Sequence, residues 1–172
     1  MKKSLFVAWL LGVLILSWCG GQSDLKKYND SIYTSIKECT DSTQTLFENY
    51  ENSDSSITVE SIMQTLEEDI SICQKSETKV KGLGDYDGDS SLIDAATKLL
   101  WLEISYLEKF WSTNHYWNLE TITDEDRLQY NGAVNELNEL EDALNAQFLV
   151  LQQAQEGFAA KHGLILDTQV EE

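Results

Sequence analysis

Three aspartates alternate with other residues in one short segment of the chain, DYDGD at residues 85–89. Alternating carboxylates are typical of the start of a calcium loop, because Ca²⁺ takes several oxygen ligands from one turn of chain. An EF-hand loop also needs glycine at position six and glutamate at position twelve, which here are Ser90 and Ala96. We therefore expect a solvated acidic turn. The alternative is weak Ca²⁺ binding by Asp85, Asp87 and Asp89.

Two cysteines lie on apolar stripes of neighbouring predicted helices, Cys39 in 24–51 and Cys73 in 58–81. At about 1.5 Å per residue, they stand roughly 18 and 22 Å from the loop that joins these helices. A disulfide at this shared level would contribute about 3 to 4 kcal/mol in the chain-entropy model, and the oxidising surroundings of an exported protein favour it. The alternative is two buried free thiols, because helix rotation decides whether the sulfurs face each other.

Aromatic side chains crowd the segment FWSTNHYW at residues 110–117. Because consecutive helical residues point in different directions, they cannot all face one core. One hypothesis is a ligand or partner surface near the end of the third predicted helix. Its candidate residues are Trp111, His115, Tyr116 and Trp117. The alternative is that these side chains cap the core and pack under the loop at 118–122.

No residue pattern predicts a catalytic centre. Di-iron bundles use Glu-x-x-His motifs, but Ser112 and Ala159 occupy the positions three before His115 and His162. With two histidines in the chain, a serine or cysteine nucleophile lacks a convincing general base. We therefore expect no enzyme and no cofactor. Glu103, on the inner stripe of the third predicted helix, is the one carboxylate that would argue otherwise if it were buried.

The charge balance narrows the range of partners. The chain of 172 residues has 12 Lys and Arg against 30 Asp and Glu, a formal net charge of −18. Such a chain is repelled by nucleic-acid phosphates, so we expect no nucleic-acid partner. Hydrophobic residues make up 42% of the sequence, which suffices for a core, and the absence of proline favours long uninterrupted helices.

The first 18 residues, MKKSLFVAWLLGVLILSW, have the pattern of an export signal. Two lysines precede an apolar stretch of about a dozen residues, which is short for a membrane span. An ordinary signal peptide would need small residues before its cleavage site, and Ser17-Trp18 fits that requirement poorly.

The stretch Leu16-Ser17-Trp18-Cys19 resembles the lipobox of bacterial lipoproteins, with Leu three and a small residue two before the cysteine. Trp18 departs from the small residue that the family prefers there. The resemblance implies that Cys19 carries acyl chains, palmitate among them, and becomes the mature N-terminus. Each buried methylene then contributes about 0.8 kcal/mol to anchoring. The alternative is an uncleaved N-terminal anchor.

A lipoprotein identity implies a place in the bacterial envelope, with residues 19–23 as a flexible tether. Gly20, rather than Asp, after the cysteine points by enterobacterial sorting logic to the outer membrane. The end of the predicted bundle, QEGFAAKHG at residues 155–163, is similar to the ends of uncharacterised helical-bundle lipoproteins of bacterial surfaces. We therefore expect a membrane-anchored protein with a non-catalytic binding or envelope-interaction role and an envelope protein as partner. A small-molecule or Ca²⁺-binding module is the alternative.

Apolar residues recur at helical spacing in four segments, predicted as helices 24–51, 58–81, 91–118 and 123–162. Thr58, Ser91 with Asp94, and Thr123 supply start signals, and Gly163 supplies a stop. Because short loops make successive helices antiparallel neighbours, the sequence predicts an all-α, up-down-up-down four-helix bundle over residues 24–163, followed by a tail at 164–172. A continuous antiparallel coiled coil is the alternative, but four wide stripes suit a globular core better.

Overall fold

A computed structural model describes residues 23–51, 58–113, 116 and 123–163 of the chain. It contains four helices: α1 (Ser23–Glu51), α2 (Val59–Lys81), α3 (Ser91–Thr113) and α4 (Asp124–His162). The predicted all-α four-helix bundle is confirmed. Several predicted features lie outside the described residues: the leader 1–18, Cys19, most of the tether, His115, Trp117 and the tail 164–172.

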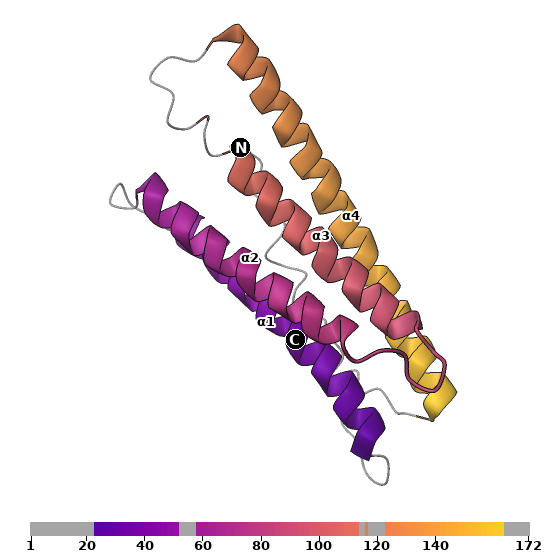
Figure 1. The fold of residues 1–172 in the computed structure, drawn as a ribbon. Helices are drawn as coiled ribbons and strands as arrows, with labels where there is room; N and C mark the ends of the chain where they lie inside the picture. Colours follow the sequence, from indigo (N-terminus) through magenta and orange to yellow (C-terminus); the bar gives the residue numbers. More distant parts are fainter. Residues whose placement is uncertain (1–22, 52–57, 114–115, 117–122, 164–172) are drawn as a thin grey trace.

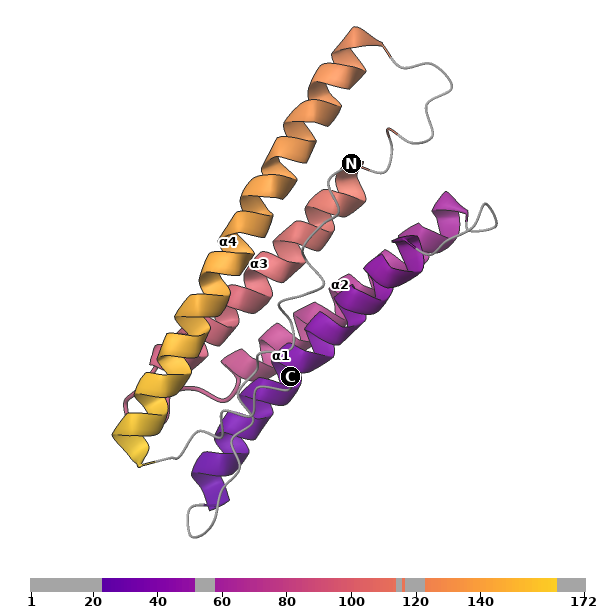
Figure 2. The same ribbon diagram turned by 180° about the vertical axis from the view of Figure 1, so that it is seen from behind.

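Successive helices pack against each other as antiparallel neighbours, α1 on α2, α2 on α3 and α3 on α4. Figures 1 and 2 show two hairpins, α1–α2 and α3–α4, that approach each other at the end where the 82–90 connection joins them and diverge toward the other end. α1 packs against α3 more closely than against α4. α4 continues beyond the end of α3 (Figure 1).

The predicted apolar stripes form the core. On α1, every third or fourth residue from Leu25 to Leu46 is buried, including Ile32 and Ile36. α3 buries its widest face, from Leu92 to Leu107, because it lies between α2 and α4. A helix with two neighbours needs such a wide apolar face, since each neighbour covers a separate part of its surface.

The side chains that start α2 and α4 are the predicted ones. The Thr58 hydroxyl accepts a hydrogen bond from the Ser61 backbone N–H at 3.2 Å. Thr123 and Asp126 form a reciprocal capping box at the start of α4. Gly163 ends α4 with φ 69°, a left-handed conformation that glycine adopts at little cost.

The start of α3 differs by one residue from the predicted capping pattern. The Ser90 hydroxyl, not that of Ser91, donates to the Asp94 carboxylate at 2.7 Å. Ser91 is engaged instead by Asp89, which accepts from its backbone N–H and from its hydroxyl. The serine that pairs with Asp94 thus lies one residue earlier in the chain, and the first backbone N–H of α3 is capped by Asp89.

α3 extends to Thr113, and most of the predicted continuation to residue 118 lies outside the described residues. The hydroxyls of Ser112 and Thr113 each donate to the backbone carbonyl three residues before, those of Lys109 and Phe110, at 2.7 Å. Within the described part of the chain, no helix combines the length and apolarity that crossing a membrane requires.

Candidate functional site

A set of polar side chains lies inside the bundle where α1, α2 and α3 meet, and we call it the buried polar layer. It consists of the Cys39–Cys73 disulfide, Ser42, Thr43, Asp69 and Glu103. Residues four apart share one face of a helix, so α1 presents Cys39 and Thr43 together, and α2 presents Asp69 and Cys73 together. The layer therefore brings residues from three helices to one level.

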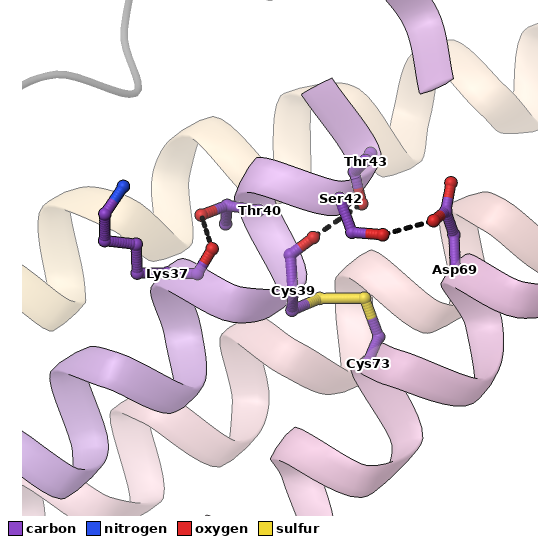
Figure 3. Close-up of a disulfide and its surroundings, with 7 residues drawn as sticks. All are labelled: Lys37, Cys39, Thr40, Ser42, Thr43, Asp69 and Cys73. Atoms are coloured by element: carbon purple, nitrogen blue, oxygen red, sulfur yellow. Dashed lines mark hydrogen bonds between the residues drawn. A yellow bond between two sulfur atoms is a disulfide. The ribbon is translucent and has the colours of Figure 1, made fainter. Parts of the chain in front are cut away.

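The disulfide ties α1 to α2 in the middle of both helices (Figure 3). The Cα atoms of Cys39 and Cys73 are 4.6 Å apart, and both residues are fully buried. The prediction of a disulfide between two cysteines at one level on antiparallel helices is confirmed. The two sulfurs are bonded to each other and are not free thiols. A bridge between residues separated by 34 positions restricts the unfolded chain and stabilises the fold by about 3 to 4 kcal/mol.

Asp69 of α2 is buried beside the disulfide, with 5% of its surface exposed. The Ser42 hydroxyl of α1 donates to its Oδ1 (Figure 3). The other oxygen, Oδ2, has no hydrogen-bond partner among the described residues. Burial raises the pKa of Asp69, and the hydrogen bond from Ser42 opposes that rise in part.

Glu103 of α3 is also buried, with 4% of its surface exposed, although a glutamate at the edge of an apolar stripe more often reaches solvent. Thr43 of α1 is its hydrogen-bonding neighbour. Burial raises the pKa of Glu103 from 4.5 to about 7, and the contact with Thr43 acts against that rise. The Thr43 hydroxyl itself donates to the backbone carbonyl of Cys39 at 3.1 Å.

Tyr106 continues the layer one turn further along α3. Burial raises the pKa of its hydroxyl above its ordinary value, and the charges of Glu141 and Glu103 raise it further. Its ring packs edge-on against Phe47 of α1, which also contacts Phe110, with ring centroids 5.9 and 5.2 Å apart. Acidic groups of α3 and α4 thus act on the same partly buried phenol.

The chemistry of this layer is that of weak acids out of contact with water. Its side chains can take up or release protons, and its hydroxyls orient the carboxyls. Among the residues that the structure describes, no group of three or more His, Cys, Asp or Glu side chains could hold a metal ion. Sequence reasoning identified Glu103 but missed Asp69, which lies beside the predicted stripe of α2 and has no pattern that marks it.

The DYDGD segment forms a tight turn. The backbones of Tyr86 and Asp89 exchange two hydrogen bonds, 3.1 and 2.9 Å long. Asp87 and Gly88 between them have φ of 51° and 74°, the two positive values that a type I′ turn requires. The side chains of Asp85 and Asp87 are exposed to solvent, as the prediction of a solvated turn requires.

Asp89 does not join Asp85 and Asp87 in a metal-ligating group among the described residues, which gives the alternative of a Ca²⁺ site at these three aspartates no support. Its carboxylate accepts from Ser91 at the start of α3 and from the Lys161 ammonium of α4 at 2.9 Å. These hydrogen bonds, those from Ser91 first, hold the pKa of Asp89 well below its usual range.

An aromatic cluster closes this end of the bundle, and only part of it could be predicted. Tyr28 of α1 stacks on Phe158 of α4, and both lie on predicted stripes. Tyr86 of the turn packs against both rings and against His162. The Tyr28 hydroxyl donates to the carbonyl of Gly84 at 2.9 Å. Burial first, and then nearby aspartates, raise the pKa of Tyr28 to about 12.

The predicted aromatic surface near the end of α3 is described for two of its four residues. Trp111 is 41% exposed, as a partner surface would need. Tyr116 instead packs on the start of α4, with its hydroxyl 3.2 Å from Gln129 Oε1 and its ring 5.7 Å from that of Tyr130. Trp101, 48% exposed on α3, was not predicted as part of a surface.

Comparison of the chain with protein-family models, with curated proteins and with solved structures finds no match in any of the three. The function must therefore be argued from the chain's own residues.

Proposed function

We propose that this chain is a bacterial lipoprotein, in which a lipidated Cys19 holds an acidic, rigid four-helix bundle at the cell envelope in a non-catalytic binding role. The observation that carries the proposal is the buried disulfide between Cys39 and Cys73. Structural disulfides persist in exported proteins and are rare in the reducing cytosol, so the bridge supports the export signal at residues 1–18.

The cysteine count agrees with this proposal. The chain has 3 cysteines, and the bridge uses Cys39 and Cys73. An odd cysteine in an exported protein usually has a separate purpose, and Cys19 follows a lipobox-like Leu16-Ser17-Trp18. Lipidation gives this thiol a role and prevents it from pairing wrongly with the other two.

The position of Cys19 suits an anchor close to the bundle. Residues 20–22 separate it from Ser23, the first residue of α1. Fully extended, such a link spans about 14 Å, so the start of α1 would stay near the bilayer surface. The net charge of −18 would repel anionic headgroups, and the bundle would project away from the membrane.

An envelope protein is the partner that we propose for the projecting bundle. Trp101 and Trp111 are exposed on α3, and exposed tryptophans are frequent anchors in protein interfaces. The rival function, a small-molecule or Ca²⁺-binding module, has less support because Asp89 is already bound to Ser91 and Lys161.

The test is acylation and fractionation of the full-length chain in a bacterium that processes lipoproteins. Labelled palmitate should enter the wild-type protein, and the protein should fractionate with membranes. The Cys19→Ala variant should take up no label, while Cys39→Ala, its control, should still be labelled. A wild-type protein that takes up no label and leaves the membrane fraction with its leader removed would overturn the proposal.

A further inference from the structure

We propose that Glu103, with Asp69 in the same buried layer, forms a proton-operated lock inside the bundle: protonation of Glu103 holds the α1–α2 hairpin against α3, and its deprotonation loosens that contact. This device depends on the buried polar layer and not on lipidation. The lock can therefore be disproved while the lipoprotein proposal stands, and the lipoprotein proposal can be disproved while the lock stands.

The first argument is the burial of both acids without a compensating cation. Glu103 and Asp69 are 4% and 5% exposed. None of the ion pairs among the described residues includes either of them. A carboxylate that is buried without a positive partner is strongly disfavoured, so such a group takes up a proton instead.

The second argument is the number of hydroxyl protons. Thr43 has one, and it is donated to the carbonyl of Cys39 at 3.1 Å. Because this proton is engaged with the carbonyl, Thr43 supports a Glu103 carboxylate only weakly, and its contact offsets only part of the rise that burial causes in the pKa of Glu103. In the α1–α2 hairpin, Asp69 Oδ2 is buried with no hydrogen-bond partner among the described residues. A proton on Asp69 removes the charge that this oxygen would otherwise share.

The third argument is the charge of the groups around the two acids on every helix. α1 contributes the neutral hydroxyls of Ser42 and Thr43. α2 contributes Glu68, whose charge raises the pKa of Asp69. α3 contributes Tyr106 and α4 contributes Glu141, and the charges of Glu141 and Glu103 both raise the pKa of the Tyr106 hydroxyl. All of these groups are neutral or acidic, so no positive charge stabilises the carboxylate forms, and the hydroxyls of Ser42 and Thr43 offset the effect of burial only in part.

The direction of the effect follows from the two states of the chain. In the unfolded chain Glu103 has its ordinary pKa of 4.5, and in the fold its pKa is about 7. The fold therefore binds the proton first, and stability rises as the pH falls through 7 until it levels off below 4.5. Because the disulfide keeps α1 on α2, the contact that deprotonation weakens is the one between this hairpin and α3. For Glu103 alone, the folding equilibrium should change about 30-fold between pH 8 and pH 5.5.

The experiment is urea unfolding of the oxidised full-length chain at pH 5.5, 6.5, 7.5 and 8. The wild-type midpoint should rise as the pH falls. In Glu103→Gln, which keeps the shape of the neutral acid, most of the rise should be lost. Glu108 is an exposed glutamate on the same helix. The Glu108→Gln variant is therefore the matched control, and its midpoint should rise on acidification as that of the wild type does. A wild-type midpoint that is flat or falls on acidification, or a Glu103→Gln variant that keeps the full rise, would overturn the lock.

A second measurement needs no variant. Amide hydrogen exchange of α1 and α3, corrected for the intrinsic effect of pH, should be faster at pH 8 than at pH 6 near Thr43 and Glu103. Amides near Leu92, which is far from the layer on the same helix, serve as the internal reference. Equal protection of both regions at the two pH values would contradict the loosening.

Discussion

Lys161 at the end of α4 reaches back to Asp89 in the connection before α3, with its Nζ 2.9 Å from Asp89 Oδ2. The same carboxylate caps the first turn of α3 through Ser91. One side chain thus fixes both the start of α3 and the end of α4 at the closed end of the bundle.

Asp89→Ala should therefore lower the free energy of unfolding by about 1 to 2 kcal/mol, because it removes a helix cap. Urea unfolding measures the change. Asp85→Ala, an exposed residue of the same turn, should have little effect and serves as the control. If both variants unfold at the wild-type midpoint, Asp89 does not act as the structure indicates.

Reduction of the disulfide should destabilise the bundle by about 2 to 4 kcal/mol, because the unfolded chain gains freedom. The comparison is thermal unfolding of the oxidised chain and of the Cys39→Ala/Cys73→Ala double variant. Reductant should lower the midpoint of the oxidised chain and leave that of the double variant unchanged. Identical midpoints with and without reductant in the wild type would show that the bridge is absent.

Phe158→Ala should cost about 3 to 5 kcal/mol, because Phe158 is 1% exposed and packs on Tyr28 and His162. Leu128→Ala on the same helix should change stability by less than about 0.5 kcal/mol, since Leu128 is 73% exposed. Chemical unfolding of both variants gives the two values. A similar cost for both would contradict the packing of α4.

Calcium should leave the thermal midpoint unchanged at millimolar concentration, because Asp89 is bound to Lys161 and not gathered with Asp85 and Asp87. A ligand that binds the folded state must raise the midpoint. A rise that the Asp87→Asn variant abolishes would restore the Ca²⁺-binding alternative. Mg²⁺ at the same concentration controls for ionic strength.

The fold could be predicted because its signals are periodic and local. The stripes that contain Ile32 and Leu99 specify which helix faces are buried, and Thr123 and Gly163 mark where α4 starts and stops. The disulfide was the favoured alternative, since two cysteines at one level on adjacent helices can meet, but the rotation of the helices decides whether they do.

The site could be predicted only in part, because its contacts join residues far apart in the chain. Lys161 and Asp89 are 72 positions apart, and no local pattern links them. In the sequence, Asp69 cannot be told apart from other polar residues beside an apolar stripe. In the structure it lies against α1, where the Ser42 hydroxyl donates to it. Helix rotation and long-range pairing are set by packing, which the sequence pattern does not specify.

The most direct test of the account is the intact mass of the full-length protein purified from bacterial membranes, with and without alkylation after reduction. The account predicts a chain that starts at Cys19, carries added acyl mass, and exposes two further thiols only after reduction. A chain with an unmodified Cys19, or with Cys39 and Cys73 free before reduction, would contradict it.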